Sequence, residues 1–502
     1  MRALYLGGVA AIALASATLP AAADPLYFTP GDLVVAVEGN GSNTAALGTS
    51  ATGNTGASAT SYLDNQAAPL TLYEFTTTGA NQTPVGTLEL PTTTSGANSA
   101  ISGEYGSSSE ATLQLSGNGQ YLTIAGYATN AAAYNAAYDV NGTGTALAQS
   151  CSLSVVANCA GVPQVARVIA TISSSGAVDT STVVYNVANE NNPRSVYSSD
   201  GHSFYLSGQG TGNAGDSSGG VFFIPGTGPN QTPVAITGLD TTNKTISQDT
   251  RDVQIVNNTL VVSTDTKQGS NAARSFIGTL GSPPSTGLYS NGDGPTMLPG
   301  FGNTGGTGKQ VITTATANGI NANGLQINLS PQGYFFANAT TLYVADDGAP
   351  KQNSATSSLG DGGLQKWSLV NGTWILDYTL SAGLNLVANS SAHGTSGLFG
   401  LTGQIVTVNG VQIVELFATN YTLSDLDPTY LYGINDTLSD LTDGSLDGSF
   451  TMLAAAPAGT NFKGVSFAPV PEPTTIWLFG AGLAGVAFMG LRRKAKVGAA
   501  TA

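Results

Sequence analysis

The chain has 502 residues, of which 41% are hydrophobic and only 9% charged, and it contains 65 Gly, 19 Tyr and 16 Phe. This hydrophobic content excludes an intrinsically disordered chain, even though the charge is low. Residues 24–470 carry 29 acidic and 10 basic residues, a net charge of −19. A surface of this sign argues against nucleic acid and anionic lipid as partners.

The N-terminus begins with Arg2, followed by an apolar stretch from Ala3 to Leu19 and by alanines at residues 21–23. This order predicts a secretory signal peptide, residues 1–23, that is cleaved after Ala23. A retained N-terminal anchor is the alternative, but no stop-transfer sequence follows the apolar stretch.

The predicted fold class for residues 24–469 is all-β, because Thr, Val and Tyr suit strands and Gly and Asn suit the tight turns between them. One class of segment is predicted to be strand, tight turn and strand, with Asn, Asp or Gly at its centre. These segments are residues 111–127, 194–208, 251–265, 333–347 and 403–420. A second class, more polar at the turn, alternates with the first: residues 70–90, 165–187, 219–239, 362–380 and 429–454.

Alternating inner and outer hairpins predict four-stranded sheets repeated in series, which is typical of a β-propeller. We expect about six blades (six or seven). Residues 461–469 should pair with residues 31–39, which closes the ring and leaves no exposed sheet edge. A chain of β-sandwiches and a right-handed β-helix are the alternatives. Residues 39–61 and 281–307 are expected to be long insertions.

One five-residue string occurs twice in the second class of hairpin. Asn-Gln-Thr-Pro-Val stands at residues 81–85 and again at residues 230–234, an offset of 149 residues. The aromatic and aliphatic positions before it also align, Tyr73 with Phe222 and Phe75 with Ile224. We expect the two copies to occupy equivalent places in two blades.

The chain contains two cysteines, Cys151 and Cys159. In an oxidising compartment such a close pair predicts a disulfide that closes a small loop, with unpaired or metal-bound cysteines as the alternative. Trp367 and Trp374 flank an Asn-Gly turn. If these tryptophans were exposed, they could stack on sugar rings. Their even spacing across a hairpin instead favours packing in the core.

No catalytic constellation stands out, and no catalytic residue is predicted. Residues 215–219 match G-x-S-x-G, but a nucleophilic serine needs a histidine base, and only His202 and His393 exist. The motif also lacks the strand–turn–helix setting of a nucleophile elbow. A Gly/Ser-rich turn that enters a strand at Val221 explains it as well.

No cofactor is expected, with calcium as the possible exception, because loop carboxylates and carbonyls are its usual ligands. The weak candidates in the first group are Asp346, Asp347 and Asp361. The second group comprises Asp425, Asp427, Asp436, Asp440, Asp443 and Asp447. None has the spacing of an EF-hand, and solvated turn residues are the default interpretation.

The C-terminus contains three features in order: the triplet Pro471, Glu472 and Pro473, an uncharged stretch at residues 475–491, and a basic tail at residues 492–496. The stretch predicts one transmembrane helix, with Arg492 and Arg493 left in the cytoplasm by the positive-inside rule. A buried C-terminal helix is the alternative, and the basic tail argues against it. Residues 480–485 match G-x-G-x-x-G, but small residues within a membrane span ease helix packing instead.

Pro471, Glu472, Pro473, the apolar segment, and Arg492 and Arg493 closely resemble the PEP-CTERM sorting signal of bacterial surface proteins, here residues 470–502. The resemblance implies processing by an exosortase, a membrane enzyme thought to cleave near the triplet. It also implies export to the outer surface or extracellular matrix, after transient anchoring in the inner membrane. Such proteins are typical of Gram-negative bacteria that make extracellular polysaccharide, a candidate partner.

Two functions follow as hypotheses. The first is a non-catalytic propeller that binds or scaffolds at the cell surface or in the biofilm matrix. The alternative is a calcium-dependent hydrolase or lyase acting on extracellular glycans or phosphate esters. An enzyme should gather acidic and basic groups at the central channel, and 10 basic residues spread singly along the body do not favour this. Arg194, Arg251 and Arg274 are the ones to check, since Arg194 and Arg251 both open inner hairpins.

Overall fold

The computed structural model divides the chain into one compact unit, Tyr27–Pro471, and a second made of Met1–Leu26 and Glu472–Ala502. The described residues are 27–39, 62–107, 109–139, 144–152, 159, 161–211, 217–237, 249–265, 275–283, 294–301, 311–313, 326–348, 362–388, 390–442 and 448–471. The predicted signal peptide, the segment at residues 475–491 and the basic tail lie outside them. Of the helices that are described, none has the length and apolar character needed to cross a membrane.

The described part of the Tyr27–Pro471 unit is built almost entirely of β-strands. Its helices are α1 (Ala131–Tyr138) and the 3₁₀ turn η1 (Leu147–Gln149). Helix α1 begins where the side chain of Asn130 accepts a hydrogen bond of 2.8 Å from the backbone N–H of Ala133, as N-cap residues do. The all-β prediction is therefore confirmed.

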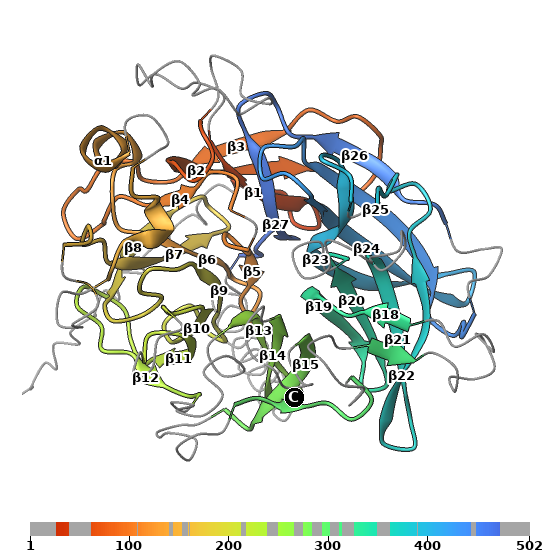
Figure 1. Ribbon diagram of the computed structural model, residues 1–502. Coiled ribbons are helices and arrows are strands. Elements are labelled where there is room, and N and C mark those ends of the chain that lie inside the picture. The colour runs from red at the N-terminus through yellow and green to blue at the C-terminus, as the bar shows by residue number, and fades with distance from the viewer. Residues whose placement is uncertain are drawn as a thin grey trace, which may run out of the picture. The chain divides into compact units, whose positions relative to one another are not determined.

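Four separate four-stranded antiparallel sheets form blades that follow one another around a common centre (Figure 1). The first contains β9 (Pro193–Tyr197), β10 (Phe204–Gly208), β11 (Gly220–Ile224) and β12 (Val234–Ala235). The second contains β13 (Thr250–Val256), β14 (Thr259–Asp265), β15 (Ser275–Gly281) and β16 (Thr296–Met297). The third contains β19 (Pro331–Asn338), β20 (Thr341–Asp346), β21 (Gly363–Val370) and β22 (Thr373–Leu380). The fourth contains β23 (Thr395–Val408), β24 (Val411–Thr422), β25 (Tyr430–Thr437) and β26 (Thr451–Ala455).

The remaining strands form one nine-stranded sheet and one separate pair. The large sheet contains β27 (Asn461–Phe467), β1 (Leu33–Glu38), β2 (Ala67–Phe75), β3 (Gly86–Glu89), β4 (Ser102–Glu104), β5 (Gln114–Leu115), β6 (Tyr121–Tyr127), β7 (Arg167–Ser173) and β8 (Val178–Val184). The pair is β17 (Val311–Thr313) with β18 (Gln326–Asn328).

The number of separate blades differs from the expected six or seven. Strand β4 pairs with β2 on one side and with β6 on the other, so it joins β27-β1-β2-β3 to β5-β6-β7-β8 in a single sheet. Four blades therefore stand as separate sheets. The sequence could not indicate this, because β4 is a three-residue bridge between two predicted hairpins.

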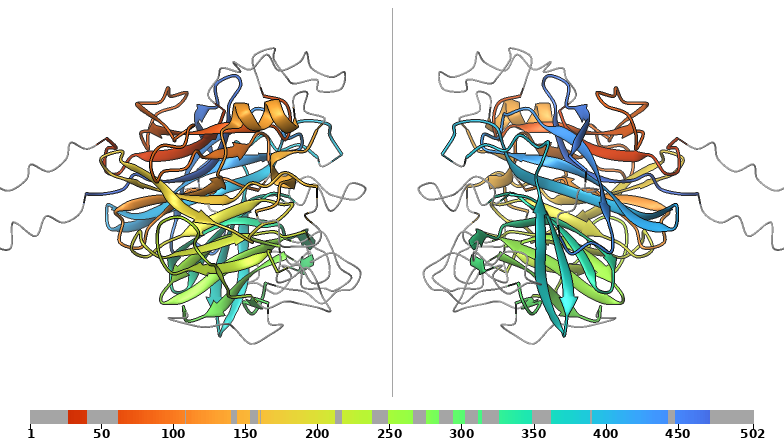
Figure 2. Two further views of the ribbon diagram at one scale, coloured as in Figure 1. Left: turned by 90° about the vertical axis from the view of Figure 1, so that its left-hand side faces the viewer. Right: turned by 90° about the vertical axis from the view of Figure 1, so that its right-hand side faces the viewer.

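The ring closes as the sequence predicts. Strand β27 pairs antiparallel with β1, with Leu33 opposite Phe467 and Val35 opposite Val465. The innermost strands β27, β5, β9, β13, β19 and β23 contact one another in succession and return to β27. Figure 1 shows the same order around the centre, and in the side views of Figure 2 the blue C-terminal strands lie beside the red N-terminal ones. This closure excludes the chain of sandwiches and the β-helix.

All ten predicted hairpins are present. The Asn409–Gly410 turn between β23 and β24 has φ values of 51° and 82° at its two central residues, the left-handed conformation that Asn and Gly tolerate best. Strand β1 is buried at all six of its positions, because its two faces pack into two different hydrophobic core clusters. Its sequence LVVAVE is accordingly an almost continuous apolar run instead of an alternating one.

Buried hydroxyl groups join neighbouring sheets at four equivalent places. In each case a hydroxyl on the second strand of one blade donates to a backbone carbonyl on the innermost strand of the next. The pairs are Thr123 with Val196 (2.6 Å), Ser207 with Arg251, Ser263 with Gln332 (2.7 Å) and Thr419 with Lys463 (2.6 Å). All four hydroxyl-bearing residues are fully buried. They satisfy carbonyl groups that would otherwise be orphaned between sheets.

We expect Ser263→Ala to lower the free energy of unfolding by about 1–3 kcal/mol, because it leaves two buried backbone groups without a partner. These are the Gln332 carbonyl and the Asp252 N–H, which donates to the Ser263 hydroxyl at 2.9 Å. Chemical denaturation measures the change. Ser95→Ala, at an exposed position, is the control. Equal stability of the two variants would contradict an inter-blade role for the hydroxyl.

The two copies of Asn-Gln-Thr-Pro-Val occupy equivalent positions, as predicted. Asn81 and Asn230 have φ values of 54° and 58°. The backbone N–H of Gln82 donates to the carbonyl of Leu453 on β26 at 2.6 Å, and that of Gln231 donates to the carbonyl of Val183 on β8 at 2.8 Å. Each copy therefore fastens an outer turn to the outermost strand of the preceding sheet.

Candidate functional site

Arg194 and Arg251 lie at comparable positions, as the second residues of the innermost strands β9 and β13. Arg194 forms a buried ion pair with Asp249, and its Nη1 donates to the carbonyl of Thr250 at 3.2 Å. Its Nη2 donates to Oε1 of Gln209 at 2.7 Å. Both side chains are almost completely buried, so the two charges interact with each other and with neighbouring protein groups, and not with solvent.

The contacts of Arg194 begin a series of buried polar contacts along the innermost strands, which we call the belt. Arg251 continues the belt. Its Nη1 donates to Oε1 of Gln332 at 2.8 Å, and Nε2 of Gln332 donates to Oδ2 of Asp347 at 2.6 Å. The hydroxyl of Ser396, the second residue of β23, donates to the carbonyl of Asp347 at 2.9 Å. The belt thus passes from β13 through β19 to β23. Arg274, the third arginine singled out in the sequence, lies outside the described residues.

Three further buried carboxylates and one lysine belong to the belt near strands β27 and β1. We call Glu38, Glu104 and Glu110 the acidic cluster. Lys463 on β27 places its Nζ 3.5 Å from Oε2 of Glu38 and donates to the carbonyl of Ser107.

Each carboxylate of the acidic cluster also accepts hydrogen bonds from the protein itself. Glu38 accepts from the backbone N–H of Gly106 at 3.2 Å. Glu110 accepts from the Tyr127 hydroxyl and from the Asn192 amide, both at 2.9 Å, and from the backbone N–H of Glu104. These donors hold the acidic cluster in a fixed arrangement.

The sequence did not single out the acidic cluster. One signal was present: Glu38 ends the apolar run from Leu33 to Val37, and an acidic residue at the end of a fully buried strand is unusual. The partners of Glu104 and Glu110 come from distant segments, so no local pattern identifies them.

Burial raises the pKa of all three carboxyl groups of the acidic cluster above the ordinary value of 4.5. The neighbouring Glu110 raises the pKa of Glu104 further. Because the folded state then holds these protons more tightly than the unfolded state, the contribution of the three groups to stability is fully present below pH 4.5. It is lost as the pH rises through the folded-state pKa values.

We expect Glu104→Gln to raise the melting temperature at pH 8 and to change it little near pH 4.5, where the native carboxyl group is already protonated. Glutamine keeps an oxygen that can accept the hydrogen bond from the backbone N–H of Ala148. Scanning calorimetry at the two pH values measures the difference. Glu89→Gln, on the exposed side of β3, is the control. A lower melting temperature of Glu104→Gln at pH 8, without a similar loss near pH 4.5, would contradict this and show that the Glu104 charge is stabilising.

Acidic and basic groups therefore do meet around the centre, and the expectation that the scattered basic residues would not gather there is wrong. Arg194, Arg251 and Lys463 all lie at the starts of innermost strands, which the ring of sheets brings together. Each is at least 93% buried. Their charges serve neighbouring side chains and carbonyl groups.

Two of the calcium candidates in the described residues, Asp346 and Asp347, accept hydrogen bonds from the protein itself. Asp346 is completely buried. It accepts hydrogen bonds from the N–H groups of Ser330 and Gly348, both at 2.8 Å, and from the amide of Gln365 at 2.9 Å. Asp347 accepts from Gln332 and is also buried, so neither residue is the solvated turn residue of the default interpretation.

The other candidates are dispersed. Asp436 belongs to a buried network with Lys366, and Asp427 lies 2.7 Å from Nδ1 of the exposed His393. Asp440 is a half-buried turn residue whose backbone N–H donates to the carbonyl of Thr437 at 3.1 Å. Asp361, Asp443 and Asp447 lie outside the described residues.

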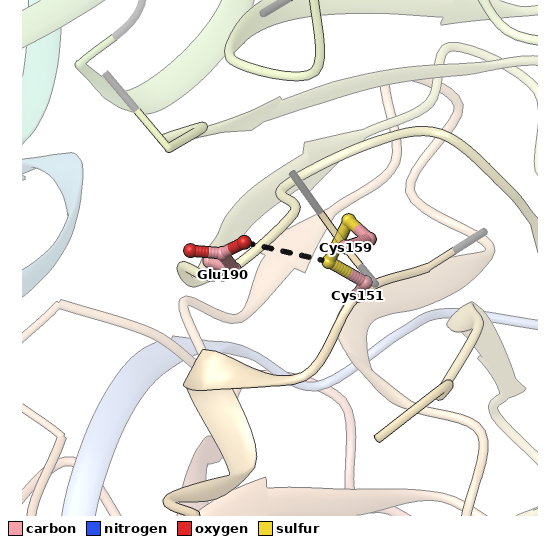
Figure 3. A group of neighbouring side chains, drawn as sticks. All are labelled: Cys151, Cys159 and Glu190. Carbon is pink, nitrogen blue, oxygen red and sulfur yellow. Dashed lines mark hydrogen bonds between the residues drawn. A yellow bond between two sulfur atoms is a disulfide. The ribbon is translucent and has the colours of Figure 1, made fainter. Parts of the chain in front are cut away.

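Cys151 and Cys159 form a disulfide with a Cα–Cα distance of 5.9 Å. Oε1 of Glu190 lies 3.8 Å from the sulfur of Cys151 (Figure 3). These three side chains are the group of possible metal ligands that lie within reach of one another in the described residues. Because both sulfur atoms are bonded to each other, the arrangement is a cross-link and does not offer thiolate ligands.

Both tryptophans pack in the core, as the sequence favours. Trp367 is fully buried and stacks on Phe301 at a centroid distance of 4.1 Å. Trp374 is 6% exposed and meets Phe336 edge to face at 5.8 Å. Neither can serve as an exposed platform for a sugar.

The serine at the nucleophile position of the G-x-S-x-G match is Ser217, which is exposed, and no hydrogen bond joins it to a histidine in the described residues. The next residue, Ser218, is buried, and its hydroxyl accepts a hydrogen bond from the backbone N–H of Asn189 at 3.1 Å. His202 lies in a turn with its ring 6.3 Å from that of Tyr121. Residues 215 and 216 are outside the described residues.

A cavity of about 460 Å³ opens beside the last strand of the nine-stranded sheet, and we call it the β8 pocket. Its walls come from the turn at residues 94–99, from Ala128, from Ser152 and residues 164–166 next to the disulfide, and from Val183 and Tyr185 at the end of β8. Among the described residues, no acidic or basic side chain lines it. The sequence contained no signal for it, because these segments are far apart along the chain.

The fold defines a β-propeller protein. The family model described as the PEP-CTERM protein-sorting motif matches residues 469–494, so the chain carries this sorting motif, as the sequence resemblance predicted. The motif implies an exported protein that an exosortase-type enzyme processes.

No curated protein matches the chain. Among solved structures it is similar to an ancestral GH74 enzyme, at 11% identity and a TM-score of 0.31, over 87% of this chain and 40% of that chain. It is also similar to the Cellvibrio cellulosa alpha-L-arabinanase, at 12% identity and a TM-score of 0.26, over 54% of this chain and 87% of that chain. The chain thus spans less than half the length of the GH74 enzyme. Likenesses this weak carry no inference about activity.

Proposed function

We propose that this protein is a non-catalytic, exported propeller that binds extracellular polysaccharide. It acts at the outer surface or in the matrix of a Gram-negative cell, after an exosortase-type enzyme has processed its C-terminus. The sorting motif supports the export route. The non-catalytic assignment is supported by the way in which the protein uses its charges.

The observation that carries the non-catalytic assignment is the burial of every basic residue in the described part of the chain. These residues are Arg167, Arg194, Arg251, Lys366 and Lys463. Each contacts the protein's own carboxylates, carbonyls or amides. An enzyme that cleaves phosphate esters needs cations directed at its substrate, and these five are directed at the protein.

A glycan-array experiment tests the proposal. The Tyr27–Pro471 unit suits it because every described core cluster lies within this unit, from Phe28 to Ala468. We expect binding to one or more neutral polysaccharides, with and without added calcium, and no release of product over hours. Absence of binding to any glycan would contradict the proposal.

The acidic cluster favours a second candidate, a glycan hydrolase that uses calcium. Glycosidases use paired carboxyl groups, often with one raised pKa, and the acidic cluster contains three such groups. All three are buried and hydrogen-bonded, so substrate would have to displace these contacts. Turnover of chromogenic glycosides or phosphate esters that is abolished by Glu110→Gln would establish this candidate in place of the first.

A further inference from the structure

The β8 pocket is the described cavity whose lining best fits an uncharged, hydroxyl-rich ligand. Its volume of about 460 Å³ lies within the usual range for small-molecule sites. The lining mixes hydroxyl, amide and phenol groups with small aliphatic side chains and contains no charge. A pyranose ring has the same mixture, with polar edges and apolar faces.

Tyr185 is the aromatic residue of the pocket. It follows directly after β8 and is partly exposed. Its ring forms no ring-to-ring contact with any described aromatic residue, unlike Trp367 and Trp374, which pack on other rings. A partly exposed aromatic side chain that lines a pocket and carries a hydroxyl tip suits a ligand that is apolar on one side and polar at its edge.

Two other parts of the wall are held by hydrogen bonds within the protein. The hydroxyl of Ser152 donates to Oδ1 of Asn189 at 2.7 Å and accepts from the backbone N–H of Val187 at 3.0 Å. Nε2 of Gln164 donates to the carbonyl of Val162 at 3.1 Å. Ser152 lies inside the loop that the disulfide closes, directly after Cys151, and Gln164 lies five residues after Cys159. A pocket with walls fixed in advance binds at a lower cost in conformational entropy.

The charge of the body also selects among polysaccharides. With a net charge of −19 over residues 24–470, the protein repels uronate-rich or sulfated chains at moderate ionic strength. The described basic residues are buried and cannot offset this repulsion at the pocket.

We propose that the β8 pocket binds one neutral hexopyranose unit of an extracellular polysaccharide, with the ring of Tyr185 stacked on a sugar face. This inference rests on the proposed function and adds to it the place of binding and the class of ligand.

The test uses the full chain in a zwitterionic detergent and isothermal titration with soluble mannan, galactan and β-glucan, with alginate as the acidic probe. We expect Tyr185→Ala to weaken binding by about tenfold or more, as the loss of a central aromatic contact does. Tyr185→Phe should keep most of the affinity, because the stacking face remains. Ala97→Arg, at an exposed position on the pocket wall, should abolish binding by filling the cavity.

Tyr138→Ala is the matched control, because Tyr138 is 49% exposed on α1 and does not line the pocket. If the native chain binds a neutral polysaccharide and both Tyr185→Ala and Ala97→Arg bind it equally well, the site is elsewhere and only this inference fails. Binding of alginate alone would overturn the ligand class. If the native chain binds none of the four, the proposed function fails as well.

Discussion

Replacing Gly464 by alanine is expected to lower the free energy of unfolding by about 3 kcal/mol or more, because the added methyl group has no space between two backbones. Gly464 lies in β27, where the ring closes, and its N–H donates to the carbonyl of Ala111 at 3.1 Å. A Cβ atom at this position would lie 2.0 Å from the backbone nitrogen of Leu113 and 2.7 Å from the Ala111 carbonyl oxygen. No side-chain rotation relieves contacts with backbone atoms, so β27 would have to move away from the segment that leads into β5.

Gly448→Ala provides the matched control for this substitution. A Cβ atom at Gly448 would meet its nearest neighbour, the Asn435 carbonyl oxygen, at an ordinary distance of 3.8 Å. Denaturant unfolding of the two variants and the native chain measures the difference. Limited proteolysis should also cut Gly464→Ala faster, because an open ring exposes sheet edges. A Gly464→Ala variant as stable as Gly448→Ala would mean that the contact between β27 and β5 does not hold the ring closed.

Replacing Lys366 by methionine is expected to cost about 3–5 kcal/mol, the usual effect of removing one partner of a buried ion pair. Lys366 is fully buried on β21, and its Nζ donates to Oδ2 of Asp436 on β25 at 2.8 Å. It also donates to the carbonyl of Thr437 at 2.7 Å and to the hydroxyl of Tyr378 at 3.0 Å. The substitution would leave the Asp436 carboxylate buried without a cation, at the junction of two blades.

The double variant Lys366→Met/Asp436→Asn separates the charge effect from packing. Asparagine keeps an oxygen that can accept a hydrogen bond from the Tyr378 hydroxyl, which donates to Asp436 at 2.6 Å in the native chain. We therefore expect the double variant to be more stable than Lys366→Met alone. If the two are equally unstable, lost packing and not an unpaired charge explains the cost.

The destabilisation caused by the single substitution Lys366→Met depends on pH, and the sign of this dependence can be predicted. Burial raises the pKa of Asp436, while Lys366 and the hydrogen bonds lower it. Without Lys366 the pKa rises further, and protonation at lower pH removes the uncompensated charge. The destabilisation of Lys366→Met should therefore shrink between pH 8 and pH 5, as measured by thermal unfolding at each pH, whereas that of Gly464→Ala should stay constant.

The sequence alone determined the local elements and the closure of the ring. Hairpins such as residues 403–420 could be predicted because period-two alternation and an Asn-Gly turn are local properties of the chain. The pairing of β27 with β1 could be predicted because a closed ring needs its last strand beside its first. The repeated Asn-Gln-Thr-Pro-Val string, the core position of both tryptophans and the sorting motif at the C-terminus were likewise visible in the sequence.

Only the tertiary structure decided how the blades join and what the charged side chains do. Strand β4 merges two sets of strands through three residues, too short a segment to recognise beforehand. Asp346 and Lys366 resemble surface residues in the sequence and are buried, because their partners approach from neighbouring strands and sheets. The β8 pocket likewise has walls from several distant segments. The physical reason is common to all three: burial and ion pairing depend on which distant segments the ring brings together, and a local residue pattern does not contain that information.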